Sequence, residues 1–192
     1  DRLKAVIGLR AEWNLVASTP RFYVTAEITA RRGQFYLVEI EKGPWGDRPE
    51  IQIAEDPVTG TLDRTVVIRE HARFTVQWGH RFGRFGVRAG IKESMFGAGV
   101  DAAFGNGRLR LSLDAMESSF SRTPRLKLAA ALEVFRSIYI LGGIDDALIP
   151  GGDLPILPAD EVPAQFKTLH YGRDYQLRFD FRFTDRDVSA LL

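Results

Sequence analysis

Apolar and polar residues alternate along most of the chain with a period of two. Residues 107–117 show the pattern most clearly, with Leu109, Leu111, Leu113 and Ala115 on one face and Arg108, Arg110, Ser112 and Asp114 on the other. Successive side chains of a β-strand point to opposite faces, so this period is the repeat of a strand. The pattern therefore predicts strands that have one apolar face and one charged face.

The same alternation marks about ten segments that are separated by turn residues. They are residues 3–16, 22–31, 34–42, 65–79, 84–93, 96–104, 107–117, 126–134, 138–140 and 175–183. Two stretches rich in proline, glycine and acidic residues, 43–64 and 144–173, predict long loops, and residues 51–53 form a possible short strand inside the first. Residues 184–192 predict a short helix with Thr184 or Asp185 as its N-cap.

These segments predict an all-β fold, a single antiparallel up-and-down β-barrel of about ten strands with a short C-terminal helix. An even number of strands places both termini at one end, and both long loops, after the third and ninth strands, then lie at the other end. The segments are near the roughly ten residues that a tilted strand needs to cross a bilayer. We expect one domain over residues 1–192, and we expect it to be the C-terminal part of a longer precursor because Asp1 opens directly into a strand pattern.

The charged face also carries many residues with almost no side chain, namely Gly8, Gly86, Gly90, Gly97, Gly99, Ala103, Ala129 and Ala131. A narrow lumen packed with arginines needs such room, whereas a solvated exterior does not. Aromatic residues lie near the ends of the apolar runs, where the girdles of a membrane barrel form: Trp13, Phe22, Trp78, Phe85, Phe96, Phe104 and Phe183. Both features favour an apolar face that points outward into lipid.

In this orientation the charged side chains must pair inside the lumen, because a lone buried charge costs several kcal/mol. The candidate residues for this internal ion-pair network are Arg10, Glu12, Arg73, Arg88, Asp101, Arg110, Asp114, Lys127, Glu133, Arg178 and Asp180. The network would keep the lumen shut or narrow.

Composition narrows the function without choosing one. The net charge of +1, from 26 basic and 25 acidic residues, argues against a nucleic-acid partner. The absence of cysteine excludes disulfides, thiolate metal sites and a cysteine nucleophile. Hydrophobic content of 45% and charged content of 27% suit both soluble and membrane proteins.

The chain carries no recognisable catalytic or metal-binding motif. His71, His80 and His170 lack metal-ligand spacing, and Ser94 lacks the glycines of a nucleophile elbow. Asp145 and the next residue, also an aspartate, could bind calcium, but turn-forming aspartates at a strand end are the commoner explanation. We therefore expect a protein without enzymatic activity, cofactor or metal.

Several stretches carry a resemblance to a known family: Gly90 to Ser94 with Gly97 to Asp101, Arg108 to Asp114, Pro124 to Lys127, Tyr139 to Asp146, and Phe183 to Asp187 with Leu191 and Leu192. This half of the chain resembles the C-terminal region of some MCE (MlaD-like) proteins of Gram-negative bacteria. The resemblance implies an outer-membrane module that anchors or docks a periplasm-spanning phospholipid transport system. It also implies periplasmic termini, and membrane phospholipid and other subunits of that system as partners.

The main alternative is a soluble lipocalin-like barrel with its apolar face inward, which would hold a lipid or another apolar ligand. A third hypothesis, an outer-membrane enzyme such as a lipase, requires Ser94 or another serine near a histidine. The direction of the apolar face separates the first two hypotheses. Arginines and aspartates on the outer wall, around an apolar centre, would exclude the membrane barrel.

Overall fold

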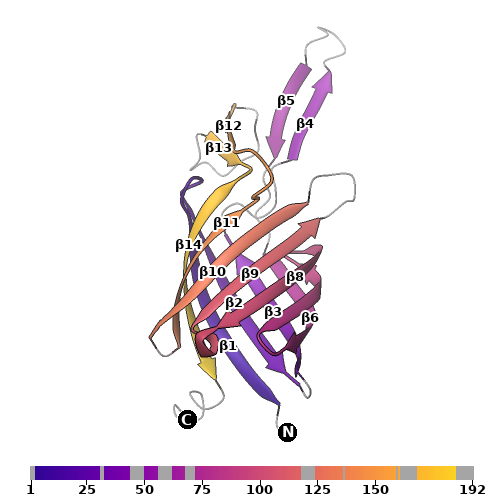
Figure 1. The fold of residues 1–192 in the computed structure, drawn as a ribbon. Helices are drawn as coiled ribbons and strands as arrows, with labels where there is room; N and C mark the ends of the chain where they lie inside the picture. Colours follow the sequence, from indigo (N-terminus) through magenta and orange to yellow (C-terminus); the bar gives the residue numbers. More distant parts are fainter. Residues whose placement is uncertain are drawn as a thin grey trace.

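The computed structural model describes residues 3–30, 33–43, 50–55, 62–67, 72–117, 124–135, 137–158, 160 and 168–184. Ten antiparallel strands close into one barrel (Figure 1): β1 (Lys4–Asn14), β2 (Thr19–Thr29), β3 (Gln34–Lys42), β6 (Arg73–Phe82), β7 (Phe85–Lys92), β8 (Met95–Phe104), β9 (Leu109–Glu117), β10 (Arg125–Phe135), β11 (Ile138–Asp145) and β14 (Asp174–Thr184). Each strand pairs with its neighbour along the chain, and β1 pairs with β14 to close the ring. The predicted all-β antiparallel barrel is confirmed.

Two small hairpins stand beside the barrel at the end away from the termini (Figure 1). One joins β4 (Glu50–Glu55) to β5 (Leu62–Val67), and the other joins β12 (Gly152–Pro155) to β13 (Thr168–Tyr171). Gly105–Gly107 form a 3-10 turn, and no helix among the described residues is long and apolar enough to cross a membrane. The predicted placement of both termini at one end and both long connections at the other is confirmed (Figure 1).

Several element boundaries differ from the sequence prediction. Residues 65–67 belong to β5 in the hairpin, and the barrel strand begins at Arg73, because the alternation continued across the break and concealed it. The strand expected at 51–53 is confirmed as part of β4, whereas the four-residue strands β12 and β13 are too short to leave a readable pattern. Of the helix expected at 184–192, Thr184 is the last residue of β14, and the rest lies outside the described residues.

The strand expected at residues 138–140 extends to Asp145 as β11. The sequence pattern ended at two glycines, but Gly143 lies where β10 and β11 approach each other closely. A Cβ atom at this position would lie 2.5 Å from the Leu128 carbonyl oxygen. Glycine is therefore the residue that lets the strand continue here.

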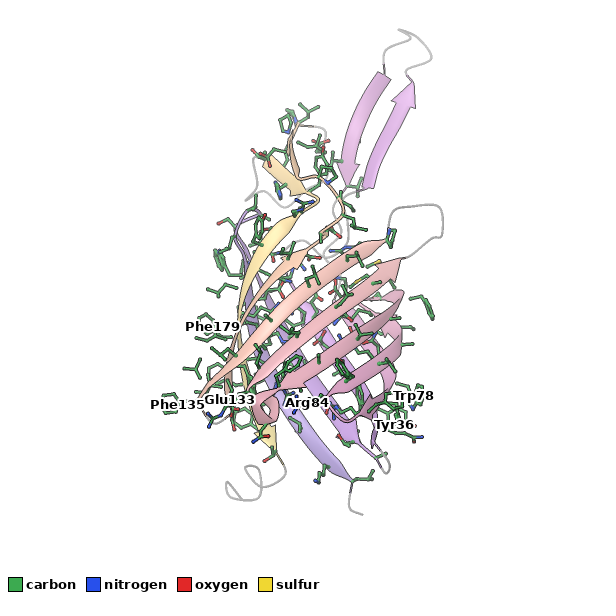
Figure 2. The ribbon with its side chains drawn as sticks, in the orientation of Figure 1. Tyr36, Trp78, Arg84, Glu133, Phe135 and Phe179 are labelled. Carbon is green, nitrogen blue, oxygen red and sulfur yellow. The ribbon has the colours of Figure 1, made fainter. Side chains whose placement is uncertain are left out.

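The two faces of the barrel wall have opposite chemistry, as the side chains in Figure 2 show. Apolar side chains point away from the lumen and are exposed, for example Leu9 at 49% and Phe22 at 61%. Charged side chains point inward and are buried, for example Glu12 at 2% and Asp180 at 0%. The predicted outward direction of the apolar face is confirmed, and the inward apolar face of the alternative barrel is not observed.

Candidate functional site

Exposed aromatic side chains gather toward the two ends of the outer wall. Toward the long loops lie Trp13, Phe22, Phe74, Phe96 and Tyr175, and toward the termini lie Tyr36, Trp78, Phe82, Phe85 and Phe135. Figure 2 shows Tyr36, Trp78 and Phe135 at the termini end of the barrel. Phe74 and Phe82 stand eight residues apart on β6, roughly 27 Å along the strand and roughly 20 Å along the barrel axis at a tilt of about 40°. This height is near the apolar belt of about 25 Å that membrane barrels present.

An apolar groove of about 660 Å³ crosses the outer wall from β7 to β11. Its floor follows one row of paired residues across five strands: Phe85, Ala102, Leu111, Ala130 and Gly142. The neighbouring row is larger and consists of Val87, Val100, Leu113, Leu128 and Ile144. A Cβ atom added at Gly142 would meet nothing within 4 Å, so the floor is open at that position. The groove can therefore seat a hydrocarbon chain.

The lumen near the long loops is closed by a dense ion-pair network. Arg73 reaches Glu41 at 2.5 Å and Glu93 at 3.2 Å, and Lys127 pairs with Glu93 and, at 3.4 Å, with Asp145. These five side chains are all buried. Arg21 and Arg125 add further ion pairs to the same carboxylates. Every strand that contributes is part of the closed ring, so the barrel wall holds these charges in place.

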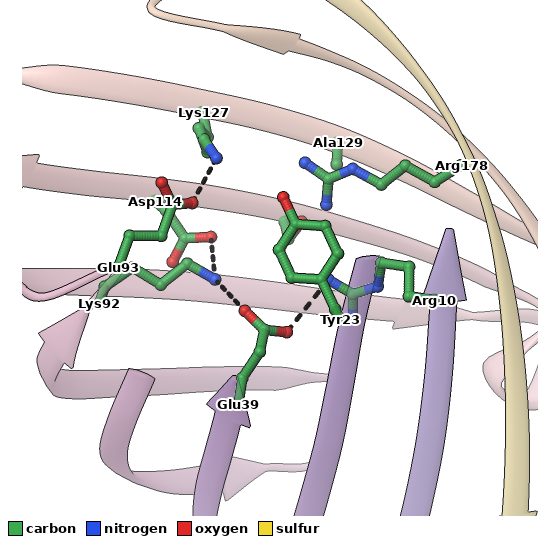
Figure 3. A pocket seen from close by; sticks show the side chains of 10 residues that line it. Arg10, Tyr23, Glu39, Lys92, Glu93, Asp114, Lys127, Ala129 and Arg178 are labelled. Atoms are coloured by element: carbon green, nitrogen blue, oxygen red, sulfur yellow. Dashed lines mark hydrogen bonds and ion pairs between the residues drawn. The ribbon is translucent and has the colours of Figure 1, made fainter. Parts of the chain in front are cut away.

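A second layer of ion pairs lies in the middle of the lumen. Arg88 bridges two carboxylates, Asp101 at 2.5 Å and Asp114 at 2.7 Å. Figure 3 shows Glu39 between Arg10 at 3.3 Å and Lys92 at 3.6 Å. The space left among these side chains is about 10 Å³, which is about the room that one water molecule needs. This space is too small for an apolar ligand.

Most of the residues that the sequence singled out lie in these two layers. Ion pairs are formed by Arg10, Glu12, Arg73, Arg88, Asp101, Asp114, Lys127, Arg178 and Asp180. Arg110 and Glu133 lie nearer the termini, and no ion pair joins either of them to another of the described residues.

Sequence reasoning missed other members of the network, namely Arg21, Glu39, Glu41, Lys92, Glu93, Arg125, Asp145 and Arg182. The signal for two of them was present, because Glu39 and Glu41 alternate with Val38 and Ile40. Glu93 carried no such signal, since it lies in the turn after β7 with a φ of 49°.

Ser94, His80 and Asp145, which were considered for other chemistry, have structural roles here, and His71 lies outside the described residues. The Phe74 N–H donates to the Ser94 hydroxyl in the turn near the long loops, whereas His80 lies toward the other end of β6 against Phe82. Asp145 accepts from Arg125 at 3.2 Å and is neutralised by it. Within the described ranges, no group of three or more histidine, aspartate or glutamate side chains could hold a metal ion.

Comparison with known proteins identifies a family. The model of a lipocalin-like domain matches residues 6–190, which is nearly the whole chain. The search of the curated proteins found no match.

This match corrects the resemblance to the MCE (MlaD-like) region, which was wrong, together with the outer-membrane phospholipid-transport module that it implied. The residues that suggested it are explained by barrel geometry. Glu93 and Ser94 form a turn with positive φ of 49° and 63°. Gly99 leaves space for the ion pairs of the lumen, because a Cβ atom there would lie 2.4 Å from an Asp114 oxygen. Such positions recur in closed barrels whose lumens are crowded, so they do not identify a family.

Proposed function

The chain belongs to the lipocalin-like domain family, and on that premise we propose that it binds lipid through the outer wall of its barrel. The observation that carries this proposal is an apolar belt to which every barrel strand contributes an exposed residue: Leu9, Val24, Ile40, Val76, Val87, Val100, Leu111, Leu132, Ile140 and Phe179. Soluble monomeric proteins rarely expose continuous apolar patches larger than a few hundred Å². Such a belt is expected to contact the acyl chains of lipids.

We propose that the barrel works inside a bilayer, with membrane phospholipid as its partner. We propose that this bilayer is the outer membrane of a Gram-negative bacterium and that both termini of the barrel lie on the periplasmic side. Short turns at the termini end and long connections at the other end support this placement, since barrels of that membrane have the same asymmetry. The filled lumen supports a role in binding lipid rather than in conducting solutes.

A second candidate function is the one that the family match favours, a soluble lipocalin-like barrel that binds one lipid or another apolar ligand. The groove of about 660 Å³ supports it, because pockets for small ligands commonly measure roughly 300–1,000 Å³. In this protein such a ligand would lie on the outer wall over β7 to β11 rather than in the lumen.

Tryptophan quenching separates the two functions. A variant whose single tryptophan is Trp78, which is exposed on the outer wall, is mixed with phosphatidylcholine vesicles that contain brominated acyl chains. We expect the protein to float with the vesicles and its fluorescence to be quenched. A protein that stays monodisperse without detergent, does not float and is not quenched would contradict the bilayer proposal. Binding of one fatty acid per chain in that state would establish the second candidate.

A further inference from the structure

A cluster of side chains, which we call the vestibule, lies at the termini end of the lumen and consists of Glu27, Phe35, Arg81, Arg110, Tyr139 and Arg182. Its floor is apolar and buried, since Tyr139 is 7% exposed and packs with Ala131 and Leu141. Its charged side chains reach solvent: the Arg81 side chain is 40% exposed and the Arg182 side chain is 22% exposed. The vestibule is thus accessible from outside, although the ion-pair layers close the lumen beyond it.

Two arginines of the vestibule flank one aromatic ring. The guanidinium carbon of Arg182 lies 4.7 Å from the centre of the Tyr139 ring, and that of Arg110 lies 5.3 Å from it. The Arg110 Nε–H donates to the Gly107 carbonyl oxygen at 3.3 Å, which fixes the side chain further. Both guanidinium groups are therefore held in place before any ligand arrives.

The carboxylates of the vestibule are already engaged by other arginines. Both Glu27 oxygens accept from Arg81, at 2.7 and 2.8 Å, and Asp180 accepts from the Arg182 Nε–H at 2.9 Å. Arg110 forms no ion pair with a carboxylate among the described residues. The positive charges of Arg182 and Arg81 act on it unfavourably, and the Glu27 carboxylate, which Arg81 engages, acts on it favourably. Glu133, the β10 residue paired with Tyr139, also lies toward this end, so the unfavourable interaction is the local repulsion between Arg110 and Arg182.

We propose that the vestibule binds a phosphate group between Arg110 and Arg182. A guanidinium donates two parallel hydrogen bonds to a phosphate, and a dianion would relieve the repulsion between the two arginines. Both guanidinium carbons lie within 5.3 Å of the centre of the Tyr139 ring. The phosphate comes either from a free anion in solution or from a lipid headgroup at the rim of the barrel. This site is separate from the outer wall, so the proposal stands whether or not the wall lies in a bilayer.

The test is titration calorimetry of the full chain in dodecyl maltoside, an uncharged detergent, with inorganic phosphate at low salt. We compare the unchanged protein with R110Q and with the matched control R84Q, which removes an exposed arginine from the turn between β6 and β7 at the same end. We expect saturable binding that R110Q weakens about tenfold or more and that R84Q leaves within about twofold. A third variant, R110K, keeps the positive charge but lacks the planar guanidinium group that donates two parallel hydrogen bonds. It should bind phosphate with intermediate affinity.

A second titration uses maltoside micelles that contain phosphatidylglycerol, so that the two phosphate sources are distinguished. Binding of either probe that depends on Arg110 supports the proposal and identifies the source. Far-UV circular dichroism of each variant checks that the barrel is folded. If neither probe binds, or if R110Q and R110K bind as tightly as R84Q, the vestibule is not a phosphate site.

Discussion

Leu111→Arg is the substitution that most directly tests the lipid-facing wall. Leu111 is 42% exposed and pairs across the sheet with Ala102 and Ala130. Ala130 is the central residue of β10, so the row lies near the middle of the apolar belt. Neither alanine can shield an arginine, whose charge would therefore face the surroundings directly.

The expected cost follows from the position. An arginine on the lipid face of a barrel near the bilayer midplane costs about 2–4 kcal/mol. This corresponds to a roughly 30- to 900-fold smaller folding equilibrium constant. In water the same change at an exposed position would alter the free energy of unfolding by about 0.5 kcal/mol or less.

The measurement is reversible urea unfolding in phosphatidylcholine vesicles, followed by tryptophan fluorescence. The matched control is Leu148→Arg, because Leu148 is 52% exposed and lies beyond the end of β11. We expect L111R to lose about 2–4 kcal/mol and L148R to stay within about 0.5 kcal/mol of the unchanged protein. Equal free energies of unfolding for the two variants would show that position 111 does not face hydrocarbon.

Three further predictions concern the lumen and the loops. Replacing Arg88 by Met leaves Asp101 and Asp114 without their shared partner and should lower the free energy of unfolding by about 3–5 kcal/mol in a denaturant titration. The same change at the exposed Arg84 should have little effect. Equal losses for the two variants would show that the lumen pairs are not buried charges. Partial burial lowers the pKa of His170, but its hydrogen bond to Asp153 outweighs this effect, so the pKa is raised. The contact therefore stabilises the β12–β13 hairpin at pH below the ordinary histidine pKa, and this stabilisation is lost as pH rises through the raised pKa. An NMR titration should show a lower His170 pKa after Asp153→Asn, and an unchanged pKa would show that the contact is absent. Replacing Asp174 by Ala removes the acceptor of two backbone N–H groups in the β1–β2 turn and of the neighbouring Tyr175 N–H, and should cost about 1–3 kcal/mol in the same denaturant titration. An unchanged midpoint would show that water replaces the carboxylate there.

The resemblance to the MCE (MlaD-like) proteins shows which sequence features fail to identify a family. Gly97, Gly99 and the pair Glu93 and Ser94 meet local requirements of strand packing and turn geometry. Any barrel with a crowded lumen and short hairpins has similar requirements, so unrelated barrels come to share these residues. The family was found only by a comparison over nearly the whole chain.

The sequence by itself determined the strands, their two faces and the end at which each connection lies. These are local properties, because the direction of a side chain follows from the parity of its position in a strand, as Leu111 and Arg110 show. Local patterns failed where one alternation continued through a break, as between Val67 and Arg73, or where glycine allowed a close approach, as at Gly143.

The tertiary structure alone decided how strands and charges meet. Arg88 bridges Asp101 and Asp114, which are 13 and 26 residues away, because the registers of β7, β8 and β9 place them together. The groove depends on the alignment of small residues across five strands, and the vestibule depends on how the ring closes. No local pattern carries this information, since a shift in one register would leave the alternation of the sequence intact and would separate the partners that meet across that pair of strands.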